Sequence, residues 1–199
     1  MNSTRITSDD TSRVSLSIGL GVAVLLLGVA IYFGLVGHAA SKETTGFDPN
    51  RPVPSDAILR SRLNADQYRV TRENGTETAF QNKFWNNVQP GIYVDVITGE
   101  PLFCSVDKFD GGTGRPTFSK PISKDSIVQK DDNSHDMHRI ELRAKRSDAH
   151  LGHLVVDPTS SSGQRYAVNS AALRFIPTAD MQHEGYAAYV SLVTQGAAK

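Results

Sequence analysis

The chain has 199 residues, a length that suits one folded domain with an appendage. Hydrophobic residues make up 39% and charged residues 21% of it, a balance typical of a globular protein rather than a disordered one. The formal net charge is zero, which gives no electrostatic reason to expect nucleic acid or an anionic membrane surface as partner. Cys104 is the single cysteine, which excludes an intramolecular disulfide and a zinc site of the CxxC type.

An uncharged apolar run extends over residues 14–37, after a polar N-terminal tail at residues 1–13. At about 1.5 Å per residue, a helix of this length crosses a hydrocarbon core of about 30 Å. The sequence therefore predicts a single N-terminal transmembrane helix. A cleaved signal peptide is the alternative, but the run is longer than a typical signal core, and Asp9 and Asp10 precede it.

Charges on the two sides of this run do not decide its orientation, because Arg5 and Arg13 precede it and Lys42 and Arg51 follow it. We expect the commoner arrangement, with the short N-terminus inside and the folded domain on the extracytoplasmic, periplasmic side. The segment at residues 38–54 is polar and rich in proline, so we expect a linker there.

The folded domain is expected to span residues 55–192, followed by a short tail at residues 193–199. It opens with a helix over residues 56–63, for which Ser55 is the expected N-cap, and a second helix or helical turn over residues 64–71, capped by Asn64. Alternating, β-branched segments bounded by turn residues then predict strands at residues 91–97, 102–105, 140–144 and 173–176. The pattern indicates a mainly β, antiparallel domain with helices at its N-terminal edge.

A series of sequence blocks extends from about residue 63 to about residue 189. With x for any residue, the blocks are QYxVTxxNGTE at 67–77, PGIYVDV at 90–96, GEPLF at 99–103, DKFD at 107–110, GxPxF at 114–118, RxExR at 139–143, DAHLGH at 148–153 and RYxxNSA at 165–171. This order of blocks resembles the B-type methionine sulfoxide reductases, which reduce the R epimer of methionine sulfoxide in proteins with thioredoxin as reductant. The resemblance implies two antiparallel sheets with short flanking helices.

The chemistry of that family needs a cysteine thiolate that attacks sulfur while an acidic group protonates the departing oxygen. The resemblance assigns the sulfoxide oxygen to His150 and His153, a polar orienting role to Asn169, a place beside the thiolate to Arg165 and part of an apolar wall to Phe175. A structural role is the alternative for two histidines beside a glycine, since such rings often bind backbone carbonyls.

The chain departs from the family pattern at three positions. Ala167 stands where the family has its nucleophile, and a methyl group cannot form the sulfenic acid on which the reaction depends. Thr113 stands where many members carry a second, resolving cysteine. Arg115 replaces a tryptophan whose indole packs against the substrate methyl group, and a guanidinium is suited instead to an anion.

Other candidate residues have simpler interpretations. The positions of the CxxC pairs in zinc-type members, 95/98 and 144/147, hold no cysteine, so we expect neither a metal nor another cofactor. Cys104 could replace the nucleophile only if it lay beside the histidines, and a small buried hydrophobic residue is the simpler expectation. The acidic segment at residues 131–136 lacks the glycine and glutamate of a calcium loop, so we expect a solvated turn.

These observations favour a membrane-anchored member of the family that keeps a binding pocket for methionine sulfoxide in a protein or peptide but lacks or nearly lacks activity. Its partner would then include the membrane and a second membrane protein. An active reductase that repairs extracytoplasmic proteins under oxidative stress is the alternative. This alternative requires Cys104 as nucleophile, or Ala167 in place of a natural cysteine. Thioredoxin is an expected partner only if the protein is an active reductase. A third hypothesis is an anion bound by Arg115, Arg165 and the two histidines.

Overall fold

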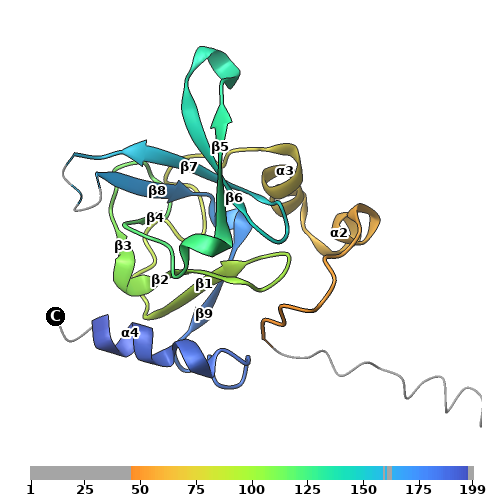
Figure 1. The fold of residues 1–199 in the computed structure, drawn as a ribbon, viewed down its shortest axis with the longest axis vertical. Coiled ribbons are helices and arrows are strands. Elements are labelled where there is room, and N and C mark those ends of the chain that lie inside the picture. Colours follow the sequence, from red (N-terminus) through yellow and green to blue (C-terminus); the bar gives the residue numbers. More distant parts are fainter. Residues whose placement is uncertain (1–45, 159, 161–162, 197–199) are drawn as a thin grey trace, which may run out of the picture. The chain divides into compact units, whose positions relative to one another are not determined.

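The computed structural model describes residues 46–158, 160 and 163–196 (Figure 1). The expected transmembrane helix at residues 14–37, the tail before it and residues 38–45 of the linker lie outside this part. Within the described residues, every helix is too short or too polar to cross a membrane. The transmembrane helix thus stays a prediction from the sequence.

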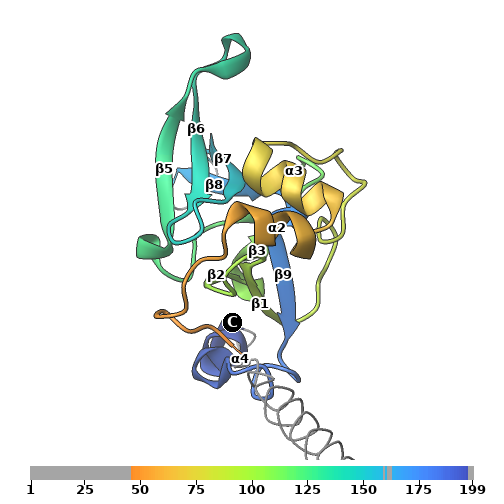
Figure 2. The same ribbon diagram turned by 90° about the vertical axis from the view of Figure 1, so that its right-hand side faces the viewer.

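Two short helices begin the folded domain, as predicted. Helix α2 spans Asp56–Arg62 and helix α3 spans Ala65–Glu73; Figure 2 shows them on one side of the domain. Asn64 caps α3 through a reciprocal pair of hydrogen bonds with Gln67, which satisfies free backbone N–H groups at the helix start. Ser55 is the N-cap residue of α2, as predicted, although its side chain makes no capping hydrogen bond.

The strands form two antiparallel sheets, which confirms the expected fold class. The first sheet has the order β2-β1-β9, with strands β1 (Gly91–Asp95), β2 (Pro101–Cys104) and β9 (Leu173–Pro177). The second sheet has the order β3-β4-β8-β7-β6-β5. Its strands are β3 (Lys108–Phe109), β4 (Thr117–Phe118), β5 (Ile127–Asp132), β6 (Arg139–Ala144), β7 (His150–Val156) and β8 (Gln164–Val168).

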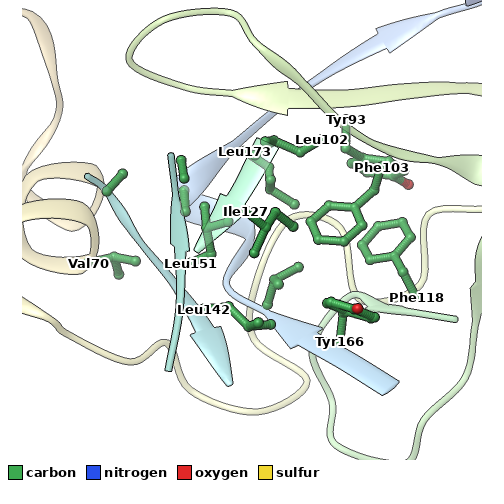
Figure 3. Close-up of a cluster of buried hydrophobic side chains, with 14 of the residues drawn as sticks. Val70, Tyr93, Leu102, Phe103, Phe118, Ile127, Leu142, Leu151, Tyr166 and Leu173 are labelled. Atoms are coloured by element: carbon green, nitrogen blue, oxygen red, sulfur yellow. The ribbon is translucent and has the colours of Figure 1, made fainter. Parts of the chain in front are cut away.

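The main core lies between the sheets and is rich in aromatic side chains (Figure 3). Phe103 of the first sheet stacks on Phe118 of the second, with 4.4 Å between ring centroids. Tyr93 meets the same Phe118 ring edge-on at 5.1 Å. Leu142 and Leu151, from β6 and β7, extend this core and are fully buried. The packing therefore fixes the two sheets against each other through residues that point inward.

A smaller cluster covers the other side of the first sheet. Helix α4 (Val190–Gly196) lies there, at the opposite end of the domain from the projecting β5–β6 hairpin (Figure 1). Val193 of α4 is 2% exposed and packs with Ile92, Ile176 and Met181. Helix α4 thus continues through the expected domain end at residue 192.

Candidate functional site

One row of side chains crosses the six-stranded sheet on the face opposite the core. Side chains alternate between the two faces of a strand, and directly paired residues of antiparallel strands share a face. Phe118, Tyr166 and Leu154 form a row that faces the core. The neighbouring row therefore faces outward; it is called the outer row here and consists of Phe109, Thr117, Ala167, His153, Glu141 and Lys130, on β3, β4, β8, β7, β6 and β5.

A β-bulge brings both histidines to this outer face. Residues three apart in a regular strand point to opposite faces, so His150 and His153 should be separated. The pairing of β6 with β7 shifts, however: Leu142 pairs with Gly152, and the next residue, Arg143, pairs with His150. The extra β7 residue, Leu151, reverses the alternation. The two imidazole rings consequently lie together, edge to face, with 5.5 Å between their centroids.

His150 is held by a buried network of charges. Its Nδ1 donates to Glu141 Oε1 at 2.6 Å, and the same oxygen accepts a hydrogen bond from Arg143 Nη1 at 2.6 Å. Arg143 in turn binds Asn74 and Asp148. Burial lowers the pKa of His150, an effect that the hydrogen bond to Glu141 opposes. His150 Nε2 is buried without a hydrogen-bond partner among the described residues, so it is the ring atom left for a ligand.

His153 is held by the β5–β6 hairpin, through Asp132 at the end of β5. Its Nε2 lies 2.7 Å from Asp132 Oδ2, which also accepts a hydrogen bond from Arg139 Nη2 at 2.6 Å. Hydrogen bonds from the Ser134 side chain and backbone, and then from His153, lower the pKa of Asp132, so this carboxylate is ionised at neutral pH. The ionised carboxylate orients the imidazole ring of His153 through this hydrogen bond.

A cleft of about 640 Å³ lies over the two histidines. The end of α3 and the segment after it, with Glu73, Asn74 and Thr76, form one wall, and the tip of the β5–β6 hairpin forms the other. Both rings and the carboxylates of Glu141 and Asp132 line it. When protonated, His150 can donate from Nε2 to an oxygen acceptor in this cleft, and a sulfoxide oxygen is such an acceptor.

Asn169 closes the end of β8 beside the site. Its Nδ2 donates to Leu151 O at 3.0 Å, and its Oδ1 accepts a hydrogen bond from Glu77 N at 3.0 Å. The side chain is 1% exposed. Asn169 therefore links the bulged part of β7 to the loop after α3, and its orienting role is exerted through the backbone.

Comparison with known proteins identifies the family of this chain. Residues 63–177 match the SelR domain, more than half of the chain. The chain belongs to the B-type methionine sulfoxide reductase family. It is also similar to a peptide methionine sulfoxide reductase MsrA/MsrB of Vibrio cholerae, with 48% identity over 139 residues. That match covers 70% of this chain and 37% of the relative, so the chain spans little more than a third of the relative's length.

Both cysteine positions of the family lie around Thr117. Ala167, at the nucleophile position, pairs with His153 on one side and with Thr117 on the other. The Oγ1 atoms of Thr113, at the resolving position, and Thr117 are 3.4 Å apart. The two positions that the sequence resemblance assigns to cysteines therefore lie on either side of Thr117, and they hold a methyl group and a hydroxyl.

Both arginines assigned to the site bind other groups of the chain. The guanidinium of Arg115 donates from Nε and Nη2 to Glu77 O, at 3.2 and 2.9 Å. Arg165, which shares the outer face with Ala167, has Nη1 3.6 Å from Asp157 Oδ2. With one guanidinium on a backbone carbonyl and the other beside a carboxylate, the geometry offers little support for the anion hypothesis.

Phe175 and Cys104 are not brought to the histidines, since both lie on the three-stranded sheet. The Phe175 ring packs on Tyr93 and Phe84, with centroid distances of 4.8 and 6.2 Å, and lines a separate hollow. Cys104 is 2% exposed, in the smaller core cluster with α4, and burial raises the pKa of its thiol. A buried thiol with a raised pKa is a poor nucleophile.

Three of the four positions at which zinc-type members carry cysteines are joined by side-chain hydrogen bonds. Asp95 is fully buried, its Oδ2 accepts a 2.6 Å hydrogen bond from the Thr98 hydroxyl, and the Ser147 side chain also donates to its carboxylate. Ala144, at the fourth of these positions, has no polar side chain. Among the described residues no cluster of three or more histidine, cysteine or acidic side chains could hold a metal ion.

Two residues of the site were missed by the sequence analysis. Asp132 lies in the segment expected to be a solvated turn, but it binds His153. Glu141 stood in a family block without an assigned role, although it alternates along β6 on the face that carries the histidines. The role of Glu141 could have been suspected from its place in the family block at residues 139–143. The role of Asp132 depends on how the β5–β6 hairpin folds against β7, which the sequence pattern does not reveal.

Proposed function

We propose that this chain is a membrane-anchored member of the family that binds methionine sulfoxide in proteins or peptides and reduces it at most very slowly. The observation that carries the proposal is the pairing of Ala167 with His153 in the β7–β8 ladder. Reduction begins when a thiolate attacks the sulfoxide sulfur, and the residue at this position has no sulfur. The histidine pair, its two carboxylates and the cleft that they line support binding of the oxygen.

The position of Cys104 argues against a second nucleophile. This thiol packs on the far side of the three-stranded sheet and lies 3.9 Å from Gly91 O. A nucleophile must reach the substrate sulfur while a proton donor reaches its oxygen, and geometry takes precedence over pKa in that requirement. Cys104 would need a large rearrangement of a buried strand to satisfy it.

The test is an assay of methionine-R-sulfoxide reduction by the full chain, with dithiothreitol and then with thioredoxin as reductant. We expect no turnover above background for the wild type, and turnover for Ala167→Cys. Adding Arg115→Trp should raise the rate further. The matched control is Ala171→Cys, which adds a thiol four residues away, after β8; all variants also carry Cys104→Ser. Wild-type turnover comparable to that of Ala167→Cys would refute the proposal.

Binding is tested separately from chemistry. A peptide with a methionine-R-sulfoxide should bind the wild type more tightly than its unoxidised form, because only the former offers an oxygen to the histidines. His150→Ala should remove most of this difference. Equal affinities of the two peptides for the wild type would exclude a sulfoxide site.

The membrane anchor is part of the same proposal. Residues 14–37 would hold the domain at the membrane, on the extracytoplasmic side, where it meets oxidised exported proteins or a membrane-protein partner. Deletion of residues 14–37 should move the protein from the membrane fraction to the soluble fraction. Orientation is decided by an alkaline phosphatase fusion at the C-terminus, which is active only outside the cytoplasm; an inactive fusion at normal expression would contradict the expected orientation.

A further inference from the structure

A second cavity, of about 360 Å³, lies at the β3 end of the outer row. Trp85, Val88 and Phe109 form its apolar wall, and Ser105, Lys108 and Asp110 are among its polar lining residues. Phe109 pairs with Thr117, which pairs with Ala167. The cavity and the histidines therefore lie on opposite sides of Ala167 along one line of paired residues.

Three polar side chains of this cavity are already bound inside the protein. Lys108 Nζ donates to Trp85 O at 3.0 Å, and Asp110 Oδ1 accepts a hydrogen bond from Gly112 N at 2.9 Å. Ser105 Oγ accepts one from Gly91 N at 3.0 Å. Burial also lowers the pKa of Lys108. Because these three side chains are engaged within the protein, the apolar wall is the part of the cavity free to bind a ligand without competing with a hydrogen bond of the fold.

The apolar wall is accessible and is held in place by a second aromatic ring. Val88 is 92% exposed, although it lies on the cavity wall. The Phe80 ring meets Trp85 edge-on, with 5.3 Å between centroids. Phe80 N in turn donates to Gly114 O at 2.8 Å, which joins this aromatic pair to the loop before β4. These contacts fix the position of the apolar wall in the folded domain.

The position of the cavity matches the repeat of an extended peptide. Adjacent strands are about 4.8 Å apart, so Phe109 on β3 is about 10 Å from Ala167 on β8. In an extended peptide, side chains two residues apart share a face and lie about 7 Å apart. The difference between these two distances, a few ångströms, is within the length of a large side chain. A residue two positions from the oxidised methionine can therefore enter the cavity.

We propose that this cavity binds an aromatic or large aliphatic side chain located two residues from the methionine sulfoxide in the bound peptide. The inference rests on the proposed function and specifies its substrate class: oxidised segments with a large apolar neighbour. Binding of such a side chain removes apolar surface of Trp85, Val88 and Phe109 from water, which is the source of the affinity.

The single tryptophan makes the test direct, since Trp85 is the only one in the chain and lies in the cavity wall. The full chain is titrated in detergent with short peptides that carry methionine-R-sulfoxide and either phenylalanine or glycine two residues away, on each side in turn. The phenylalanine peptide should bind about tenfold more tightly on one side, as expected for partial burial of an aromatic ring. It should also shift Trp85 emission to shorter wavelength.

Two variants distinguish the cavity from a general effect. Phe109→Ala should reduce the phenylalanine preference to less than threefold without changing the affinity for the glycine peptide. Val88→Asp, at an exposed position that folding does not depend on, should do the same. Ile58→Ala, a matched change of a 48% exposed residue on α2, should leave the preference intact.

The outcomes separate this inference from the proposed function. Equal affinities of the phenylalanine and glycine peptides, with Trp85 emission unchanged and the preference for oxidised over unoxidised peptide retained, would overturn the cavity inference alone. Loss of the preference for oxidised peptide in the wild type would overturn the proposed function, and the assignment of this cavity would fall with it.

Discussion

Replacement of Gly152 by alanine should destabilise the domain by several kilocalories per mole, because this glycine forms the bulge that places both histidines on one face. Its φ of +155° is a conformation that side chains rarely adopt. A Cβ at this position would lie 2.2 Å from Ala167 O, a backbone atom of the neighbouring strand. Backbone strain costs about 1–3 kcal/mol, and forced separation of packed strands costs about 1–3 kcal/mol more.

The expected loss is therefore about 2–6 kcal/mol, a large part of the 5–15 kcal/mol of a typical domain. The assay is urea unfolding of the full chain in detergent, followed by Trp85 fluorescence. Gly112→Ala is the matched control, since Gly112 also has a positive φ, +68°, but an added Cβ there meets nothing within 4 Å. It should cost only about 1–2 kcal/mol. Equal unfolding midpoints for the two variants would refute the role assigned to the close approach of β7 and β8.

Three further changes test other parts of the site and the core. Asn169→Ala should cost about 1–3 kcal/mol, because it leaves Glu77 N without its side-chain partner and removes one of the two hydrogen bonds that Leu151 O accepts from Asn169; Asn86→Ala, at an exposed asparagine, should cost less than about 0.5 kcal/mol, and similar losses would contradict this. The lowered pKa of His150 means that the unfolded chain binds a proton more readily, so its contribution to stability is complete above the ordinary value of 6.5 and falls as pH decreases below it. Between pH 7.5 and pH 5.5 the wild type should lose more unfolding free energy than His150→Gln; equal losses would argue against the buried neutral ring. Cys104 should react with a thiol reagent at pH 8 at least a hundredfold more slowly in the native protein than in urea, since its thiol is enclosed and its pKa is raised; equal rates would place it at the surface.

Much of the fold could be predicted because its local signals are strong. Asn64 followed by Gln67 marks the start of α3, and the alternating β-branched residues after Gly91 mark β1. The strands that were missed carry their signals less clearly. Strand β5 ends in an acidic, exposed segment, and β7 contains a bulge at which the alternation of side chains breaks down.

The site was predictable only as far as sequence blocks carry it. His150 and His153 were correctly grouped by the resemblance. Their spacing alone would place them on opposite faces of a regular strand, and the bulge in β7 brings both rings to one face. Asp132 was missed because a hairpin tip of polar residues looks like a solvated turn. Phe175 was assigned to the pocket wall by the resemblance to the family, but it lies on β9 of the other sheet, where its ring packs on Tyr93.

The orientation of the outer row has a consequence for how this scaffold can change. Ala167 points away from the aromatic layer that joins the sheets, so exchange of a thiol for a methyl group there alters reactivity while the interior keeps its packing. A substitution of this size at residue 167 therefore leaves the packing between the sheets intact, and no compensating mutation is needed to preserve folding.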